Sequence, residues 1–188
     1  MRPAEIDDIA AFISAGYDDD IFFEWVVPSA ERRHSVVKSY YAKYLSAKGA
    51  FVYIAEENGT TVGAACWLPH DVDPTLYDKI DAATGEFAPN FRAVADASHA
   101  NEPHGIAFTQ LVGFVVDKMQ RGRGIGTALL AAHLNEMDAK GEATYLEAST
   151  PFHGGGVYGK LGYKIYSDVM RFSPTAILWP LFREAGAL

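Results

Sequence analysis

The stretch that decides the fold is residues 115–127, which has the sequence VVDKMQRGRGIGT. Before it, residues 106–116 are almost uniformly apolar, as expected of a strand buried on both faces. After it, apolar residues recur at helical spacing from about Gly124 to Lys140, and Gly141 stands where a glycine closes a helix. The sequence therefore predicts a buried strand, a glycine-rich turn and an amphipathic helix in direct succession.

The turn of this unit has the composition of an anion site. Gly122, Gly124 and Gly126 alternate with larger residues, so the backbone can approach a ligand closely. Their amides stand at the start of a helix, where unpaired N–H groups and the helix dipole favour a phosphate. A turn without a ligand is the alternative, but strand, glycines, cations and helix follow one another as an anion site requires. The spacing differs from the G-x-G-x-x-G of dinucleotide-binding folds, and the Gly-Lys-Ser/Thr of a P-loop does not follow.

Local patterns predict helices and strands over most of the remaining chain. Helices are expected at residues 6–16, from about 29 to 49, in one or two segments over 76–98 and through residue 158, and strands at 51–55, 61–68, 144–149, 163–166 and 169–172. Asn58-Gly59 predicts a tight hairpin between the first two strands. The succession of strand, helix and strand over residues 106–149 predicts a right-handed crossover with a parallel pair. The tail around Trp179 is expected to pack back on the sheet.

Composition narrows the class of protein. With 188 residues, 49% of them hydrophobic, the chain is expected to form a single domain over residues 1–188. A net charge of -8 argues against a nucleic-acid partner. Cys66 stands alone in an apolar strand, which excludes an internal disulfide and favours a core residue over an acyl carrier. The histidines show no HExxH-like spacing, so we expect no metal site. The sequence also shows no signal peptide and no span of ~20 apolar residues, so we expect no membrane contact and a cytoplasmic location.

Residues 121–126 resemble motif A of the GNAT superfamily of N-acetyltransferases, R/Q-x-x-G-x-G/A. Arg121, Gly124 and Gly126 match its fixed positions. The resemblance is strongest over residues 106–166, with a weaker likeness to the puromycin N-acetyltransferase branch at 66–69 and 146–151. It implies an α/β fold whose mixed, mostly antiparallel sheet of six or seven strands is flanked by helices and splayed in a V at the cofactor.

The resemblance also implies a reaction, in which an acetyl group passes from acetyl-CoA directly to the primary amine of a small molecule. Acetyl-CoA would be a cosubstrate, and a homodimer is left open as the oligomeric state. The alternative from another class is a non-catalytic acetyl-CoA-binding sensor that reports cofactor level to a partner.

Particular residues follow from the resemblance as candidates. The backbone of Phe114, Val115 and Val116 would pair with the pantetheine arm, and the pyrophosphate would be held by Arg121, Gly122, Arg123, Gly124, Ile125, Gly126 and Thr127. Tyr158 falls at the tyrosine that lies beside the cofactor sulfur and protonates the departing thiolate. Its alternative role is aromatic packing between helix and sheet.

The base that deprotonates the amine is not fixed by the sequence. Glu147 is the first candidate, with His104 and Asp117 behind it, and a structural hydrogen-bonded carboxylate is the alternative. The acceptor wall is expected to include residues 18–27, the segment after Leu68 and the loop around His153. Within the first of these, the candidates for recognising a cationic amine are Asp20, Glu24 and Trp25, with capping and packing as their alternative roles.

Overall fold

The computed structural model describes residues 3–187. The helices are α1 (Pro3–Gly16), α2 (Ile21–Val26), α3 (Ala30–Leu45), α4 (Thr75–Thr84), η1 (Gly85–Phe87), α5 (Ala88–Asn101), η2 (Lys118–Gln120), α6 (Ile125–Lys140) and α7 (Val157–Lys160), of which η1 and η2 are 3-10 turns. The strands are β1 (Phe51–Glu57), β2 (Thr60–Pro69), β3 (Phe108–Val116), β4 (Ala143–Ala148), β5 (Lys164–Ile165), β6 (Met170–Arg171) and β7 (Ile177–Arg183). The strand, turn and helix predicted around residues 115–127 are thus confirmed as β3, η2 and α6.

The strands join into one mixed sheet. Among the described residues it has seven strands, in the order β1-β2-β3-β4-β7-β5, with β6 paired to β7. The neighbours β3 and β4 are parallel, and the other pairs are antiparallel. Both the crossover through α6 and the mostly antiparallel α/β class were predicted and are confirmed.

The sheet opens where β3 and β4 part. They pair only from Phe108 opposite Ala143 to Leu111 opposite Leu146, although both strands continue beyond that point. Here β3 has a bulge, because Cys66 and Trp67 of β2 pair with Gly113 and Leu111, which leaves the intervening residue without a partner on β2. Since a bulge bends and twists its strand, the carboxyl ends of β3 and β4 diverge, and the predicted V results.

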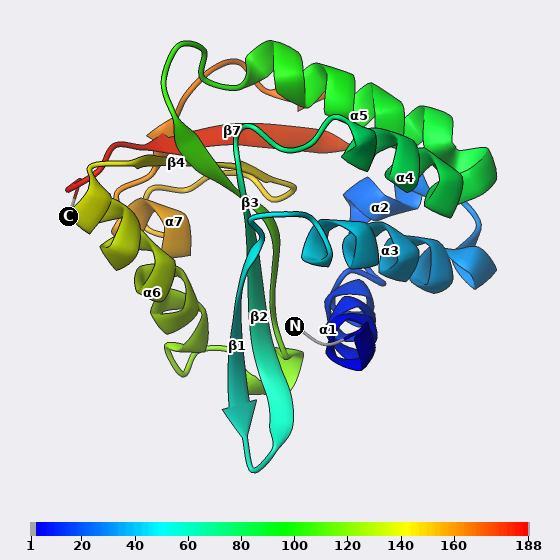
Figure 1. The fold of residues 1–188 in the computed structure, drawn as a ribbon, viewed down its shortest axis with the longest axis horizontal. Coiled ribbons are helices and arrows are strands. Elements are labelled where there is room, and N and C mark those ends of the chain that lie inside the picture. Colours follow the sequence, from blue (N-terminus) through cyan, green and yellow to red (C-terminus); the bar gives the residue numbers. More distant parts are fainter. Residues whose placement is uncertain (1–2, 188) are drawn as a thin grey trace.

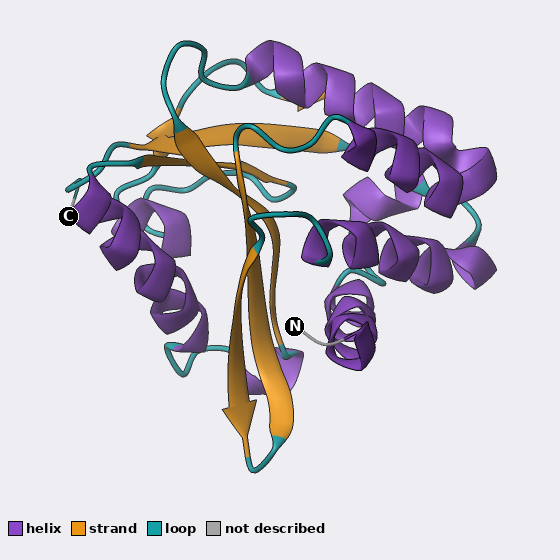
Figure 2. Cartoon of the chain, viewed as in Figure 1, coloured by secondary structure: helices purple, strands orange, loops and turns teal. Residues whose placement is uncertain are grey.

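Helices cover both faces of the sheet. Helices α6 and α7 lie on one side and α1 to α5 on the other (Figure 1), and the secondary-structure colouring makes the layering clear (Figure 2). Side chains of β2 alternate between the two cores: Cys66 packs with α1 to α5, and Trp67 packs with α6. Burial raises the pKa of the Cys66 thiol to about 12, so the prediction of a core cysteine is confirmed. None of the helices in residues 3–187 combines the length and hydropathy needed to cross a bilayer.

The β1–β2 hairpin forms as its turn residues predict. Asn58 and Gly59 have φ of 53° and 77°, which is the left-handed conformation that a two-residue hairpin turn requires. The hairpin projects from the rest of the sheet in Figure 1.

The expectation for the tail was wrong. Residues 177–183 form β7, a strand inside the sheet between β4 and β5, rather than a segment packed on it. Pro180 explains the error, because a proline removes a ladder donor and argues against an interior strand. Here Pro180 lies opposite Glu147 of β4, and its carbonyl accepts a hydrogen bond from the amide of Tyr166 (2.9 Å).

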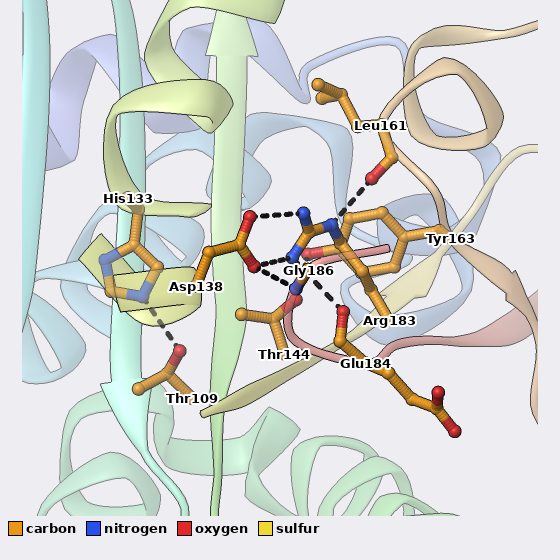
Figure 3. A network of polar contacts seen from close by, with 9 residues as sticks. All are labelled: Thr109, His133, Asp138, Thr144, Leu161, Tyr163, Arg183, Glu184 and Gly186. Carbon is orange, nitrogen blue, oxygen red and sulfur yellow. Dashed lines mark hydrogen bonds and ion pairs between the residues drawn. The ribbon is translucent and has the colours of Figure 1, made fainter. Parts of the chain in front are cut away.

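A buried arginine fastens β7 to α6. The Arg183 guanidinium donates to both carboxylate oxygens of Asp138 (2.6 and 2.8 Å) and to the carbonyl of Leu161 (2.7 Å) (Figure 3). Hydrogen bonds from Arg183 hold the pKa of Asp138 below its usual value. Because Arg183 is fully buried, this ion pair compensates a charge that would otherwise destabilise the fold.

Helix α2 was not predicted. It has only six residues, rich in aromatic and β-branched side chains, so neither propensity nor periodicity signals a helix. The Asp20 side chain caps it by accepting a hydrogen bond from the amide of Phe22 (2.9 Å).

Candidate active site

The turn between β3 and α6 is open on its outer side. Gly122 and Gly124 have φ of 77° and 83°, and a Cβ atom at either position would meet nothing within 4 Å. Gly126 serves packing, since its Cβ would lie 2.9 Å from the ring of Phe114. The first amide of α6 with an intrahelical acceptor belongs to Ala128, which donates to the carbonyl of Gly124 (3.0 Å). The three preceding amides therefore face outward at the positive end of a helix of 16 residues.

A large cavity, here named the cleft, extends from this turn into the V of the sheet. Its volume is about 890 Å³, within the range of small-molecule sites. It is bordered by the end of β3, the turn before α6, the end of β4 and helix α7. Nine of the ten candidate cofactor residues outside α7 line it: Phe114, Val115, Val116, Arg121, Gly122, Gly124, Ile125, Gly126 and Thr127.

Arg123 is the exception among these candidates. Its guanidinium turns toward the β1–β2 hairpin and binds the carboxylate of Glu57 (2.8 and 3.2 Å). It does not line the cleft. Arg121 remains beside the cleft, where its Nε donates to the carbonyl of Val116 (3.3 Å).

The edge of β3 that faces the cleft is partly occupied by a side chain. The amide of Asp117 donates to the carbonyl of Val62 in β2 (3.0 Å). Because backbone groups alternate in direction along a strand, those of Val115 also face β2, and those of Phe114 and Val116 face the gap between β3 and β4. The Tyr17 hydroxyl donates to the carbonyl of Phe114 (3.2 Å) and accepts from its amide (3.1 Å). Tyr17 thus takes both polar groups of Phe114 at the edge where a further strand would pair.

A glycine brings Tyr17 to this place. A Cβ atom on Gly16 would lie 2.2 Å from a methyl carbon of Val115, so only glycine allows the end of α1 to approach β3 so closely. The Tyr17 ring then stacks on Tyr41 at 5.6 Å. The role of Tyr17 could not be predicted from local sequence, because its contact with Phe114 joins residues 97 positions apart.

Glu147 lies near the end of β4 and borders the cleft. Its carboxylate accepts hydrogen bonds from the hydroxyls of Ser98 in α5 (2.6 Å) and of Tyr145 (3.0 Å). Both donors are neutral, and within residues 3–187 the carboxylate forms no ion pair with a lysine or arginine. Burial raises the pKa of Glu147 to about 7; the two hydrogen bonds oppose this shift, and the charge of Glu102 adds to it.

Tyr158 faces the cleft from α7. Its ring lies 6.2 Å from Phe114 and 6.0 Å from Tyr163. In the described part of the chain, its hydroxyl has no hydrogen-bond partner, so this polar group is free to meet a ligand. Burial raises the pKa of this phenol well above the ordinary value.

The sequence matches a known protein family. Residues 16–163 match the model of the "Acetyltransferase (GNAT) family".

The chain belongs to the GNAT family of acetyltransferases.

Solved GNAT structures have the same fold at low sequence identity. A "histone acetyltransferase HPA2 and related acetyltransferase" from Corynebacterium glutamicum aligns with a TM-score of 0.65 at 19% identity, over 98% of this chain and 91% of that one. A mosquito "arylalkylamine N-Acetyltransferase like 5b" aligns with a TM-score of 0.64 at 15% identity, over 96% and 95%. The Drosophila melanogaster polyamine N-acetyltransferase gives 0.59 at 14% identity, over 97% and 94%. The search of curated proteins found no match.

A second cavity adjoins the cleft of this GNAT fold on the side of α1 to α5. It measures about 120 Å³ and is named the aromatic pocket here, after the rings that line it from four helices: Phe22, Phe23, Tyr40, Tyr41, Tyr44, Tyr77 and Phe91. The residues that border both cavities are Tyr17, Phe114, Glu147, Ser149 and Tyr158. Glu147 and Tyr158 therefore lie where the two cavities meet.

The other candidates for the base lie elsewhere. His104 is exposed and lines neither cavity. Asp117 also lines neither, and its side chain caps η2 by accepting from the amide of Met119 (2.8 Å). Of the three carboxylate and imidazole candidates, Glu147 alone borders the cavities.

The expected acceptor wall is only partly found beside a cavity. Phe22 and Phe23 of segment 18–27 and several residues after Leu68 line the aromatic pocket. In the loop around His153, Gly155 and Gly156 line the cleft, whereas His153 itself is exposed and lines neither cavity. The three recognition candidates have structural contacts: Asp20 caps α2, Glu24 lies 3.8 Å from Arg33, and Trp25 packs on Phe172 at 5.0 Å. Asp20 also accepts a hydrogen bond from Ser149 at the edge of the cleft (2.8 Å).

Proposed function

We propose that residues 1–188 act as a single N-acetyltransferase domain, which moves the acetyl group of acetyl-CoA directly to the primary amine of a small molecule. The observation that carries the proposal is the position of Glu147 and Tyr158, which border both the cleft and the aromatic pocket. Family membership supports acetyl transfer, and the structural neighbours include enzymes named for agmatine, polyamines and arylalkylamines.

The cleft suits the cosubstrate in volume and in chemistry. Outward amides at the start of α6 offer hydrogen bonds to a diphosphate, and Arg121 and Lys160 add positive charge along the cleft. The open space in front of Gly122 and Gly124 allows a phosphate to approach the backbone. At the edge of β3, the groups of Phe114 and Val116 can pair with amides of a pantetheine arm once Tyr17 turns away.

Glu147 is proposed as the base. An incoming ammonium ion must lose a proton before its nitrogen can attack, and a carboxylate with a pKa of about 7 is ionised to a useful extent near neutral pH. Ser98 and Tyr145 hold both carboxylate oxygens in place while Glu147 exchanges protons. The proton passes from the ammonium to Glu147, which later releases it to water.

Tyr158 is proposed as the proton donor to the leaving sulfur. The neutral amine attacks the thioester carbonyl, the C–N bond forms and the C–S bond breaks, and the tyrosine hydroxyl gives its proton to the sulfur. Because the pKa of Tyr158 is raised by burial, a lasting phenolate is unfavourable, so the hydroxyl regains a proton from the new amide nitrogen in the same step. The net products are an N-acetylated amine, CoA thiol and one proton.

The test is release of CoA from acetyl-CoA in the presence of an amine panel, followed with a thiol reagent. Cys66, the single cysteine of the chain, is fully buried, so the protein itself contributes little signal. Tyr158→Phe should slow release by roughly 10²-fold or more without weakening acetyl-CoA binding in calorimetry. A fully active Tyr158→Phe variant would refute the proton-donor role, and acetyl-CoA binding without turnover on any amine would favour the sensor.

A further inference from the structure

The aromatic pocket has the dimensions of a site for one small group. Its volume is about 120 Å³, whereas an apolar cavity of about 150 Å³ in another protein holds one benzene molecule. The pocket is smaller than that benzene site, so it takes at most one ring, and only after its walls move apart, with the linker and the amine at the junction with the cleft; an aminoglycoside or a protein segment does not fit.

The walls of the pocket favour a flat apolar body. The rings of Tyr40 and Tyr44 in α3 pack edge to face with their centroids 4.8 Å apart, and the ring centroid of Phe91 in α5 lies 4.6 Å from that of Tyr40. Hydroxyls of the two tyrosines are 3.1 Å apart and hydrogen-bond each other, so their polar atoms are satisfied within the wall. A further ring gains edge-to-face contacts with such a cluster, beyond the free energy of burying its surface.

The charges of the pocket favour a cation at Glu147. Three carboxylates border it, but Asp81 forms an ion pair with Arg92, and Glu102 bonds His99 Nδ1 (2.8 Å). Glu147 is left as the carboxylate without a basic partner among the described residues of the pocket. A second ammonium group would have to compete with Arg92 for Asp81 or with His99 for Glu102, so its burial would be costly.

From size, walls and charge together, we propose that the acceptor is a small primary monoamine that carries one aromatic ring on a short aliphatic linker. The ring packs against Tyr40, Tyr44 and Phe91, and the ammonium lies at Glu147, at the junction with the cleft. This assignment rests on the proposed acetyl transfer and specifies its substrate class. Linear polyamines are disfavoured because each further ammonium group would compete with Arg92 or His99 for a carboxylate of the pocket.

The experiment compares CoA release with 2-phenylethylamine, n-butylamine, putrescine and spermidine on the full chain. We expect kcat/KM for 2-phenylethylamine to exceed that for putrescine by roughly 100-fold, because the second ammonium group of putrescine would compete with Arg92 or His99 for a carboxylate. It should exceed that for n-butylamine by about tenfold, because the aliphatic amine lacks the ring contacts. Putrescine or spermidine used as well as 2-phenylethylamine would overturn the proposed class and leave the acetyltransferase function standing.

Two variants test whether the preference for 2-phenylethylamine over n-butylamine depends on the aromatic pocket. Phe91→Leu keeps an apolar side chain but removes a ring from the wall, and should lower the preference for 2-phenylethylamine over n-butylamine about fivefold. Phe51→Leu is the matched control, since Phe51 is partly buried against His133 on the other face of the sheet and lines neither cavity. The same change in both variants, or in neither, would overturn the assignment of the ring site.

Calorimetry separates the two proposals. The complex with CoA cannot react, yet it should bind 2-phenylethylamine, and Glu147→Gln should weaken that binding by about tenfold or more. Binding without any acetyl transfer would support the pocket and refute the proposed function. Absence of binding to the wild-type complex would overturn the inference.

Discussion

Replacing Glu147 with glutamine should slow acetyl transfer by about 10²–10⁴-fold, which is the usual contribution of a general base. Glutamine retains the shape of the side chain but cannot take the proton of the ammonium. The pKa of Glu147 is about 7 in the folded protein, so in the wild type about a tenth of the molecules are in the active ionised form at pH 6. We therefore expect kcat/KM to fall about tenfold per pH unit below neutral pH, and the variant to lack this acid limb.

Two neighbours should move that acid limb in opposite directions. The Ser98 hydroxyl lowers the pKa of Glu147 by donating to its carboxylate, whereas the charge of Glu102 raises it. Ser98→Ala should therefore shift the limb to higher pH by about one unit, and Glu102→Gln should shift it to lower pH. Glu136→Gln is the matched control, because the Glu136 carboxylate also accepts a tyrosine hydrogen bond (2.8 Å, from Tyr53) but lines neither cavity.

Stability should respond to Glu147 with the opposite sign to activity. Its pKa rises from 4.5 to about 7 on folding, so the folded state holds a proton that the unfolded state loses, and stability declines as pH rises through this window. Glu147→Gln removes this penalty. In urea denaturation at pH 8, its free energy of unfolding should exceed that of the wild type by up to about 3 kcal/mol, whereas at pH 4 the two should be equal. If Glu147→Gln keeps activity within threefold of the wild type, or if Ser98→Ala and Glu102→Gln shift the acid limb in the same direction, Glu147 is not the base.

Three further predictions concern other parts of the fold. Tyr17→Phe frees the edge of β3 from two hydrogen bonds and should tighten acetyl-CoA binding in calorimetry by about fivefold or more; weaker binding would mean that the hydroxyl helps to hold the cosubstrate. Gly124→Val should abolish acetyl-CoA binding, because the added side chain fills the space in front of the turn. Gly105→Val, at a similar φ of 78° and also in open space, should not; equal losses of binding would show that backbone strain, and not the filled space, is the cause. Asp138→Ala leaves the buried Arg183 guanidinium without its carboxylate and should lower the free energy of unfolding by about 3 kcal/mol in urea denaturation, where a loss below ~1 kcal/mol would contradict the burial argument.

Elements whose signal is local could be predicted from the sequence. The apolar run of β3, the helical periodicity of α6 and the Asn58-Gly59 turn each carry their own structural information, and each was found where expected. Strand β7 could not be predicted, because its place between β4 and β5 depends on pairing across the chain and Pro180 argues locally against it. The short helix α2 lacks a period long enough to detect.

The candidate site shows the same division. Tyr158 could be selected from the family resemblance, and Glu147 could be named as the first of three candidates from its place on the strand across the cofactor gap. Tyr145 could have been added, since two residues apart on one strand share a face. Ser98 and Tyr17 could not, because their partners lie 49 and 97 positions away. The aromatic pocket likewise assembles from four helices, and only the fold brings their rings together.

The proposed binding of acetyl-CoA depends most on the outward amides at the start of α6. A crystal structure of the protein with CoA tests it directly. We predict that diphosphate oxygens lie within hydrogen-bond distance of the amides of residues 124–127, with the thiol end between Glu147 and Tyr158. A diphosphate bound elsewhere, with this turn empty, would contradict the account.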